Sequence, residues 1–264
     1  MIKGKVIIIT GGAGLLGLEF AKAILNNNGI VVVADIDADS AYEGIEKLKQ
    51  LTESNNIEFV KLDITSEPSV NHIIDVVLKK YNRIDAWVNN AYPQISRTKK
   101  DLKREYANSF FEMNYLDFCE SISLNIGGVF LCSQIISKYF IQQGFGNIIN
   151  VSSIYGVLAP RFEIYNNTKM TMPIDYAVNK SAIIQFTKYL AKYLKNKNIR
   201  VNTLSPGGIY NNQPDSFVKE YETHSMNKGM LDKEDIAGSL LYLISDHSKY
   251  VNGQNIIVDD GWTL

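Results

Sequence analysis

The feature that most constrains the fold of this chain is a regular alternation of short β-branched runs with longer segments of helical period. The runs that we expect to form strands are 5–10, 30–34, 57–61, 86–89, 147–152, 199–204 and 255–258. Strands that alternate with helices in this way form βαβ units, whose strands lie parallel in one sheet. The sequence therefore predicts an α/β fold, a doubly wound seven-stranded parallel sheet with helices on both faces.

The 264 residues are expected to form a single domain, because α/β chains of this length commonly close around one core. Two segments break the alternation, near 92–117 and 160–173, and we interpret both as insertions in loops that follow strands. A third irregular stretch covers 211–232. Ligands of doubly wound sheets bind at the carboxyl ends of the strands, so all three segments are expected to border the ligand site.

Charge and composition exclude several classes of partner. A formal net charge of -1, with basic residues scattered among acidic ones, gives no long-range field for a polyanion, so no nucleic-acid partner is expected. The apolar run at the N-terminus is too short for a signal peptide or a membrane span, which predicts a cytoplasmic protein with no membrane partner. The two cysteines and three histidines form no ligand motif, so no metal is predicted.

A glycine cluster stands where the first predicted strand turns into a helix. Glycines without Cβ atoms let the backbone turn tightly and bring its amides close to a pyrophosphate at the positive end of the helix. This is the phosphate-binding turn of a Rossmann-type sheet. The residues that we predict to bind the cofactor here are Gly11, Gly14, Leu15, Leu16 and Gly17.

The second predicted strand is followed by Asp35, whose carboxylate can accept hydrogen bonds from the ribose hydroxyls of the adenosine. A 2′-phosphate beside this carboxylate would cost about 1 to 4 kcal/mol, and no Arg or Lys in the glycine turn offsets that repulsion. NAD is therefore favoured over NADP as the cofactor. Residues after the third and fourth strands are expected to complete the adenine and ribose side: Asp63, Ile64, Asn89, Asn90 and Ala91.

Tyr176 and Lys180 lie four residues apart at the start of a long helical pattern, so their side chains leave one face of the helix. Lowering the pKa of a phenol from about 10 to near 7 requires about 4 kcal/mol. A lysine charge at about 4 Å supplies a similar amount at an effective dielectric constant near 20. With the added charge of an oxidised nicotinamide, Tyr176 can act as a general base.

A second pair, Tyr165 and Lys169, has the same spacing and is the alternative to Tyr176 and Lys180. The residues between Tyr165 and Lys169 are poor helix formers, and Pro173 stops any helix that continues from Lys169. The residues beyond Tyr176 sustain a long helix that can hold its pair rigidly. We therefore assign the general base to Tyr176 and keep Tyr165 as the alternative.

These motifs together resemble the single-domain branch of the short-chain dehydrogenase/reductase family over nearly the whole chain. The matching stretches are 10–17, 88–91, 124–125, 150–153, 176–180, 199–202, 206–207 and 246–261. The resemblance implies that Ser153 hydrogen-bonds the reacting oxygen and that Asn125 supports a proton relay through Lys180. It also implies a homodimer or homotetramer and extends the predicted cofactor site to Pro206, Gly207 and Ile209.

The two insertions are similar to those of oxidoreductases in bacterial flagellin-modification and surface-sugar pathways. Four positions depart from the family pattern: Leu15, Tyr92, Asn211 and Asp260. Tyr92 replaces the glycine that usually follows Asn89-Asn90-Ala91, which places a bulky ring beside the cofactor crevice and makes it a candidate substrate contact.

The substrate is expected to be a small molecule, with a sugar derivative favoured by the polar insertions. Arg161 is the best single candidate for binding a substrate phosphate, within a possible cationic rim of Arg97, Lys99, Lys100, Lys103, Arg104 and Lys169. A solvated charged face is the favoured interpretation for most of these residues. The alternatives are a dehydrogenase for an apolar carbonyl and a catalytically silent dinucleotide sensor. The complete set Asn125, Ser153, Tyr176 and Lys180 favours an enzyme.

Overall fold

The computed structural model describes residues 2–93 and 110–264, and its centre is one parallel sheet. The strand order is β3-β2-β1-β4-β5-β6-β7, and each neighbouring pair is parallel. The strands are β1 Val6–Thr10, β2 Ile30–Asp35, β3 Ile57–Lys61, β4 Ala86–Asn89, β5 Gly146–Val151, β6 Ile199–Pro206 and β7 Asn255–Val258. The predicted doubly wound seven-stranded sheet is confirmed, with strand ends that differ from the expected ones by two residues at most.

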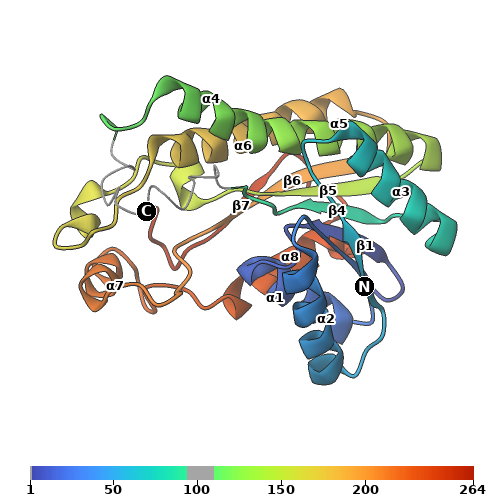
Figure 1. Cartoon of the computed structure of the whole chain (residues 1–264), viewed down its shortest axis with the longest axis horizontal. Helices are drawn as coiled ribbons and strands as arrows, with labels where there is room; N and C mark the ends of the chain where they lie inside the picture. The colour runs from blue at the N-terminus through green and yellow to red at the C-terminus, as the bar shows by residue number, and fades with distance from the viewer. Residues whose placement is uncertain (1, 94–109) are drawn as a thin grey trace.

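Two layers of helices cover the sheet, one on each face (Figure 1). One layer contains α1 Leu15–Asn26, α2 Ala38–Thr52 and α8 Glu234–Ile244. The other contains α3 Glu67–Tyr81, α5 Ile126–Gln143 and α6 Ile174–Tyr193, with α4 Tyr115–Leu124 against α6. This two-sided cover explains why the runs 6–9 of β1 and 30–34 of β2 are apolar without a break and do not alternate with polar residues.

The first strand shows how one run serves both layers. Ile7 and Ile9 belong to the core under α1, α2 and α8, whereas Val6 and Ile8 belong to the core under α3 and α5. Successive side chains of a strand point to opposite faces, so a run of four apolar residues fills two cores at once. All four side chains are buried.

The helical stretch Tyr115–Gln143 is long and apolar enough to span a membrane by length and composition alone. The stretch is divided at Asn125, where α4 ends and α5 begins with backbone angles of φ -87° and ψ -79°. Cys132, Ile136 and Phe140 of α5 are fully buried in the core against the sheet. The apolar character of α5 is therefore explained by its place between the sheet and the neighbouring helices.

A third, smaller core lies at the carboxyl ends of the strands, where α7 Asp215–Glu222 approaches the C-terminal segment (Figure 1). It also takes in two 3-10 turns, η2 Ile154–Gly156 and η3 Phe162–Tyr165. Trp262 is fully buried in this core and stacks on Tyr221 with ring centroids 5.2 Å apart. The stretch 211–232 thus contains a helix, and 160–173 contains a 3-10 turn, where the sequence predicted irregular structure.

Asp260 explains one departure from the family pattern. Its φ of 53° lies in the left-handed region that usually favours glycine, and its carboxylate accepts hydrogen bonds from the backbone N–H groups of Asn227, Lys228 and Gly229. These bonds tie the segment after α7 to the C-terminal turn. They also lower the pKa of Asp260 to about 2.

We expect Asp260→Asn to destabilise the protein in a pH-dependent way. The folded-state pKa lies below the unfolded value near 4, so the ionised carboxylate stabilises the fold above about pH 4 and loses this effect as the pH falls toward 2. The difference in guanidinium midpoint between wild type and variant should thus be constant from pH 5 to 7 and shrink toward pH 3. Asp75→Asn, an exposed site on α3, is the control, and a difference that stays constant down to pH 3 would contradict this account.

Candidate active site

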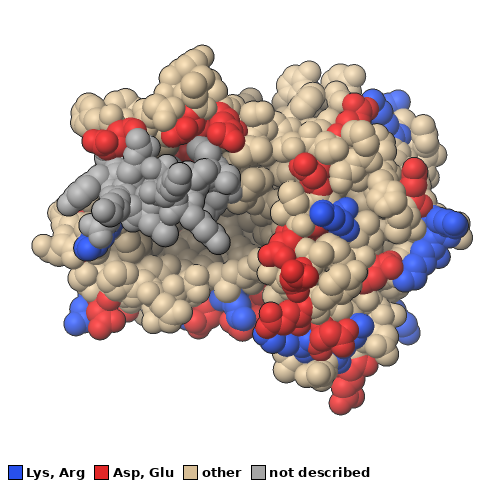
Figure 2. All heavy atoms as spheres, in the orientation of Figure 1, with Lys and Arg blue, Asp and Glu red and all other residues tan. Residues whose placement is uncertain are grey.

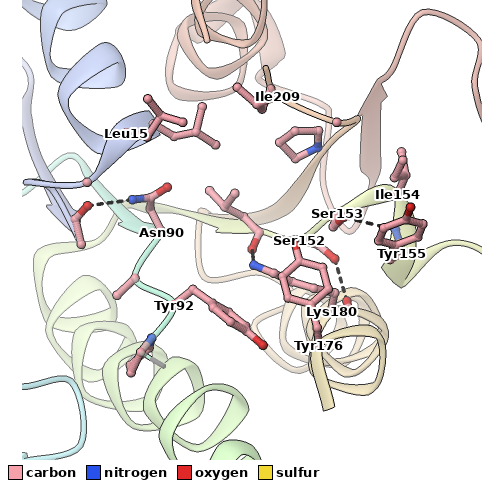
Figure 3. A pocket seen from close by; sticks show the side chains of 18 of the residues that line it. Leu15, Asn90, Tyr92, Ser152, Ser153, Ile154, Tyr155, Tyr176, Lys180 and Ile209 are labelled. Atoms are coloured by element: carbon pink, nitrogen blue, oxygen red, sulfur yellow. Dashed lines mark hydrogen bonds between the residues drawn. The ribbon is translucent and has the colours of Figure 1, made fainter. Parts of the chain in front are cut away.

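The candidate site is a cavity of about 950 Å³ at the carboxyl ends of the strands. It lies where β1 and β4 are neighbours, which is the point at which the strand order reverses and at which doubly wound sheets bind ligands. In Figure 3, Leu15 and Ile209 face Tyr92, Tyr176 and Lys180 across this cavity. Every predicted cofactor residue except Gly17 and Asn89 lines it.

The glycine turn has the geometry that close approach to a ligand requires. Gly11 has φ +60°, and a Cβ atom there would lie 2.6 Å from the Cα of Ala91. A Cβ atom on Gly17 would collide with the carbonyl oxygen of Gly11. Helix α1 begins at Leu15 with Gly14 as its N-cap, so its first amides face the cavity at the positive end of the helix. The turn therefore fits the diphosphate of a dinucleotide, and Leu15 is compatible with it because its position is helical.

Side chains hold the turn against the end of β4. The Thr10 hydroxyl accepts hydrogen bonds from the N–H groups of Asn90 and Ala91, each at 3.1 Å. Asn90 Nδ2 donates to the carbonyl oxygens of Thr10 at 3.1 Å and Gly11 at 3.0 Å. Asn89 has a different role from the expected one, because its amide is buried and bonded to Asn150 at 2.7 Å. Asn89 does not line the cavity and holds β4 to β5.

The carboxylate of Asp35 faces the cavity from the end of β2. One oxygen accepts from Ala13 N at 3.0 Å and the other from Asp37 N at 3.1 Å. Each oxygen keeps a further lone pair, so Asp35 can fix the glycine turn and still accept from a ribose. Asp63 lines the same part of the cavity, where Oδ1 accepts from Thr65 N at 2.9 Å.

Tyr176 and Lys180 enter the cavity from the first turns of α6, which begins directly after Pro173. Lys180 is buried, and its Nζ donates to the carbonyl oxygen of Val151 at 3.0 Å and lies 5.6 Å from the centre of the Tyr176 ring. Ser153 is the second residue after β5, lines the cavity and is buried. The structure therefore places Ser153, Tyr176 and Lys180 together beside the glycine turn.

The pKa values of these groups follow from burial. Burial lowers the pKa of the Lys180 ammonium to about 8. Burial also raises the pKa of the Tyr176 phenol, and hydrogen bonding with Ser153 acts in the opposite direction. The phenol is therefore desolvated in these side chains by themselves, and the predicted lowering of its pKa, which also requires an oxidised nicotinamide, stays a prediction.

Asn125 lies behind the residues that line the cavity. It stands at the break between α4 and α5, is buried, and donates from Nδ2 to the carbonyl oxygens of Pro93 at 3.1 Å and Ser121 at 3.0 Å. Its Oδ1 is buried without a partner among the described residues. The side chain thus fixes the chain after β4, and Asn125 does not itself line the cavity.

The alternative pair, Tyr165 and Lys169, does not lie on one helix face as a general base and its lysine would. Tyr165 is the last residue of η3, so Lys169 does not follow it on a shared helix. The Tyr165 hydroxyl instead forms a hydrogen bond with the Tyr155 hydroxyl at 2.9 Å, and burial raises the pKa of Tyr165 to about 12. Tyr165 lines the cavity as part of its wall.

Arg161 is not among the residues that line the cavity, contrary to its predicted contact with substrate. Its guanidinium lies over the ring of Trp262 at 5.1 Å, and its Nε is buried without a partner among the described residues. The sequence placed it close to Ser153 along the chain, but packing against Trp262 turns it away. The predicted rim residues Arg97, Lys99, Lys100, Lys103 and Arg104 lie outside the described residues.

The wall of the cavity away from the glycine turn comes mainly from the segments 160–173 and 211–232, which confirms that both border the site, although the sequence did not identify the individual wall residues. We name it the aromatic wall, and it consists of Tyr155, Tyr165, Phe217, Tyr221 and Met230. Tyr155 lies outside these two segments, two residues after Ser153. Among the described residues that line the cavity, the charged ones are Asp35, Asp63 and Lys180. On the outer surface drawn in Figure 2, basic and acidic side chains are intermingled.

A glycine turn at the switch point of the sheet and a Tyr–Lys pair in the same cavity define a class of protein, the dinucleotide-dependent oxidoreductases. A family model described as enoyl-(acyl carrier protein) reductase matches residues 12–263. The chain belongs to the short-chain dehydrogenase/reductase family, whose members act on CH–OH groups with NAD(P).

Two relatives and one solved structure show the range of this similarity. The chain is 44% identical to the post-translational flagellin modification protein A of Campylobacter coli, over 100% of both chains. It is 30% identical to the 7alpha-hydroxysteroid dehydrogenase of Bacteroides fragilis, over 99% of this chain and 95% of the relative. A short-chain dehydrogenase from Leptospira borgpetersenii, solved with bound NAD+, is 31% identical with a TM-score of 0.82, over 100% of this chain and 94% of that one.

Proposed function

We propose that this oxidoreductase interconverts a secondary alcohol and a ketone, with NAD as the preferred cofactor and a sugar derivative as the substrate. The observation that carries the proposal is the placement of Tyr176, Lys180 and Ser153 in one cavity with the glycine turn. The nicotinamide, when bound, exchanges a hydride with the carbon of the alcohol. The protein's own side chains handle the proton that leaves or enters at the oxygen.

Each side chain has a distinct task in the proposal. In the oxidation direction, the Tyr176 phenolate accepts the proton of the substrate hydroxyl as the C–H bond gives up its hydride and the C=O bond forms. Ser153 donates a hydrogen bond to the reacting oxygen. The Lys180 ammonium favours the phenolate through its charge. Asn125 holds the main chain of the loop after β4 in place by its hydrogen bond to the carbonyl oxygen of Pro93.

The preference for NAD rests on Asp35, which lines the cavity at the end of β2. We expect Asp35→Asn to narrow the ratio of NAD to NADP affinity by at least about 5-fold, because the amide keeps an acceptor oxygen and removes the charge that repels a 2′-phosphate. Fluorescence titration of both cofactors measures the ratio. Asp39→Asn, on the exposed first turn of α2, is the matched control, and an unchanged ratio in Asp35→Asn would remove the basis for the preference.

The sugar substrate is supported by the similarity to the flagellin modification protein A of Campylobacter coli and by the insertions near 92–117 and 160–173. The second candidate is an apolar carbonyl compound, which the aromatic wall favours and which the name of the Bacteroides fragilis relative exemplifies. Both candidates share the same chemistry at Tyr176. We also infer a homo-oligomer and a cytoplasmic location, as the family resemblance and the sequence predict.

A turnover screen tests the proposal and decides between the candidates. Free, phosphorylated and nucleotide-linked sugars are compared with hydroxysteroids and 3-oxoacyl thioesters, each with NAD and NADP, by the absorbance of the reduced cofactor. Turnover of a sugar with NAD supports the proposal. Turnover confined to the apolar compounds would replace the sugar by the second candidate, and cofactor binding without any turnover would favour a dinucleotide sensor.

A further inference from the structure

Tyr92 contacts both members of the Tyr–Lys pair. Its ring lies edge-on to the ring of Tyr176, with centroids 5.0 Å apart and an interplanar angle of 64°. The Nζ of Lys180 lies 4.9 Å from the centre of the Tyr92 ring, closer than to the ring of Tyr176. Figure 3 shows the three side chains on one side of the cavity. The residue that replaces a glycine of the family pattern therefore packs against the catalytic pair.

The hydroxyl end of Tyr92 is fixed by a buried polar cluster from α4 and α6. The side chains of Asn179 and Ser121 lie close to this hydroxyl and act to lower its pKa. Ser121 Oγ donates to Asp175 Oδ2 at 2.5 Å and accepts from Asn179 Nδ2 at 3.1 Å, and all three residues are buried. Burial raises the pKa of Tyr92, so its hydroxyl keeps its proton and serves as an anchor. Tyr92 also lines the cavity, and its predicted contact with substrate stays a prediction.

Lys180 has no carboxylate partner within ion-pair distance among the described residues. Its neighbours are the carbonyl oxygen of Val151 from β5, the ring of Tyr176 from α6 and the ring of Tyr92 from the loop after β4. The face of an aromatic ring carries partial negative charge and attracts an ammonium, most strongly where water is excluded. The ring of Tyr92 therefore supplies part of the stabilisation that a carboxylate would give.

We propose that Tyr92 is a positioning residue whose ring holds the protonated Lys180 beside Tyr176, while the cluster of Ser121, Asp175 and Asn179 fixes the ring in place. This inference rests on the proposed function, because it assumes that the Tyr–Lys pair carries the proton. It assigns to Tyr92 a role that a glycine at the same position cannot perform. The ring face is the active part, and the hydroxyl serves to orient it.

The experiment measures the pKa of Lys180 directly by NMR titration of protein with 13C-labelled lysine, in which Lys180→Met identifies the signal. Tyr92→Leu keeps an apolar side chain but removes the ring, so the pKa of Lys180 should fall by about half a unit to one and a half units. Tyr92→Phe keeps the ring and should change the pKa of Lys180 much less. Tyr42→Leu removes a ring that packs on Phe59, outside the cavity, and should leave the pKa of Lys180 unchanged.

Fluorinated phenylalanines at position 92 keep the proposal testable if Tyr92→Leu does not fold. Each added fluorine withdraws charge from the ring face with little change in shape, so the pKa of Lys180 should fall stepwise with their number. An unchanged or raised pKa in Tyr92→Leu and across the fluorine series would overturn the proposal, as would equal shifts in Tyr92→Phe and Tyr92→Leu. The titration needs no substrate, so its result is independent of whether the turnover screen succeeds.

Discussion

Tyr176→Phe should bind cofactor like the wild-type protein and lose turnover by at least about 100-fold, the lower end for a positioned acid or base. The ring of phenylalanine preserves the packing against Tyr92, while the missing hydroxyl removes the only group that the proposed reaction uses for proton transfer. The measurement is kcat with the best substrate from the turnover screen, together with a cofactor titration by fluorescence.

Tyr165→Phe is the matched control, because Tyr165 is another tyrosine that lines the cavity. The Tyr165→Phe variant should lose much less turnover, since the Tyr165 hydroxyl is hydrogen-bonded with the Tyr155 hydroxyl and has no lysine beside it on a shared helix. If Tyr165→Phe lost more turnover than Tyr176→Phe, the general base would be Tyr165 and the assignment to α6 would be wrong.

Lys180→Met should lose turnover as strongly as Tyr176→Phe. It should also change how the free energy of unfolding depends on pH. The folded-state pKa of about 8 lies below the unfolded value of 10.5, so the unfolded state binds more protons between these values and the wild-type protein gains stability as the pH rises. A difference of this size corresponds to about 3 kcal/mol. The free energy of unfolding of wild type, relative to Lys180→Met, should therefore rise by about that amount from pH 7 to pH 10.5.

Guanidinium unfolding of both proteins at several pH values measures this change. The lost hydrogen bond to Val151 adds an offset that is the same at every pH, so the slope with pH carries the test. Lys188→Met, an exposed lysine on the same helix, is the control and should not follow this trend. A flat difference for Lys180→Met would mean that the ammonium is not desolvated in the folded protein.

The sheet and the glycine turn could be predicted because their signals are local. Apolar runs such as 30–34 require cover on both faces, and the turn at Gly11 requires an absent Cβ atom wherever the rest of the chain lies. The start of α6 was equally local, because Pro173 fixes where the helix can begin. The choice of Tyr176 over Tyr165 as the helical tyrosine followed from this proline.

The features that the sequence did not predict depend on contacts between segments that lie far apart along the chain. The aromatic wall joins Tyr155, Phe217 and Tyr221, and although the sequence placed 211–232 beside the site, it did not indicate that α7 would pack against η3. Arg161 was assigned by its distance along the chain from Ser153, whereas its direction is set by Trp262, 101 residues later. Burial raises the pKa of the Tyr176 phenol, and the spacing of Tyr176 and Lys180 along the chain does not reveal this effect.

The bond between Tyr155 and Tyr165 makes the cavity selective in a way that its aromatic composition conceals. Two phenols that share one hydrogen bond use one O–H as the donor, and the second O–H still needs an acceptor. A ligand that displaces water from this point and brings only hydrocarbon leaves that O–H unpaired, at a cost of about 1 to 3 kcal/mol. A ligand with an oxygen at this point avoids the cost, so we expect the wall to favour ligands that carry an oxygen there, even though most of its surface is carbon.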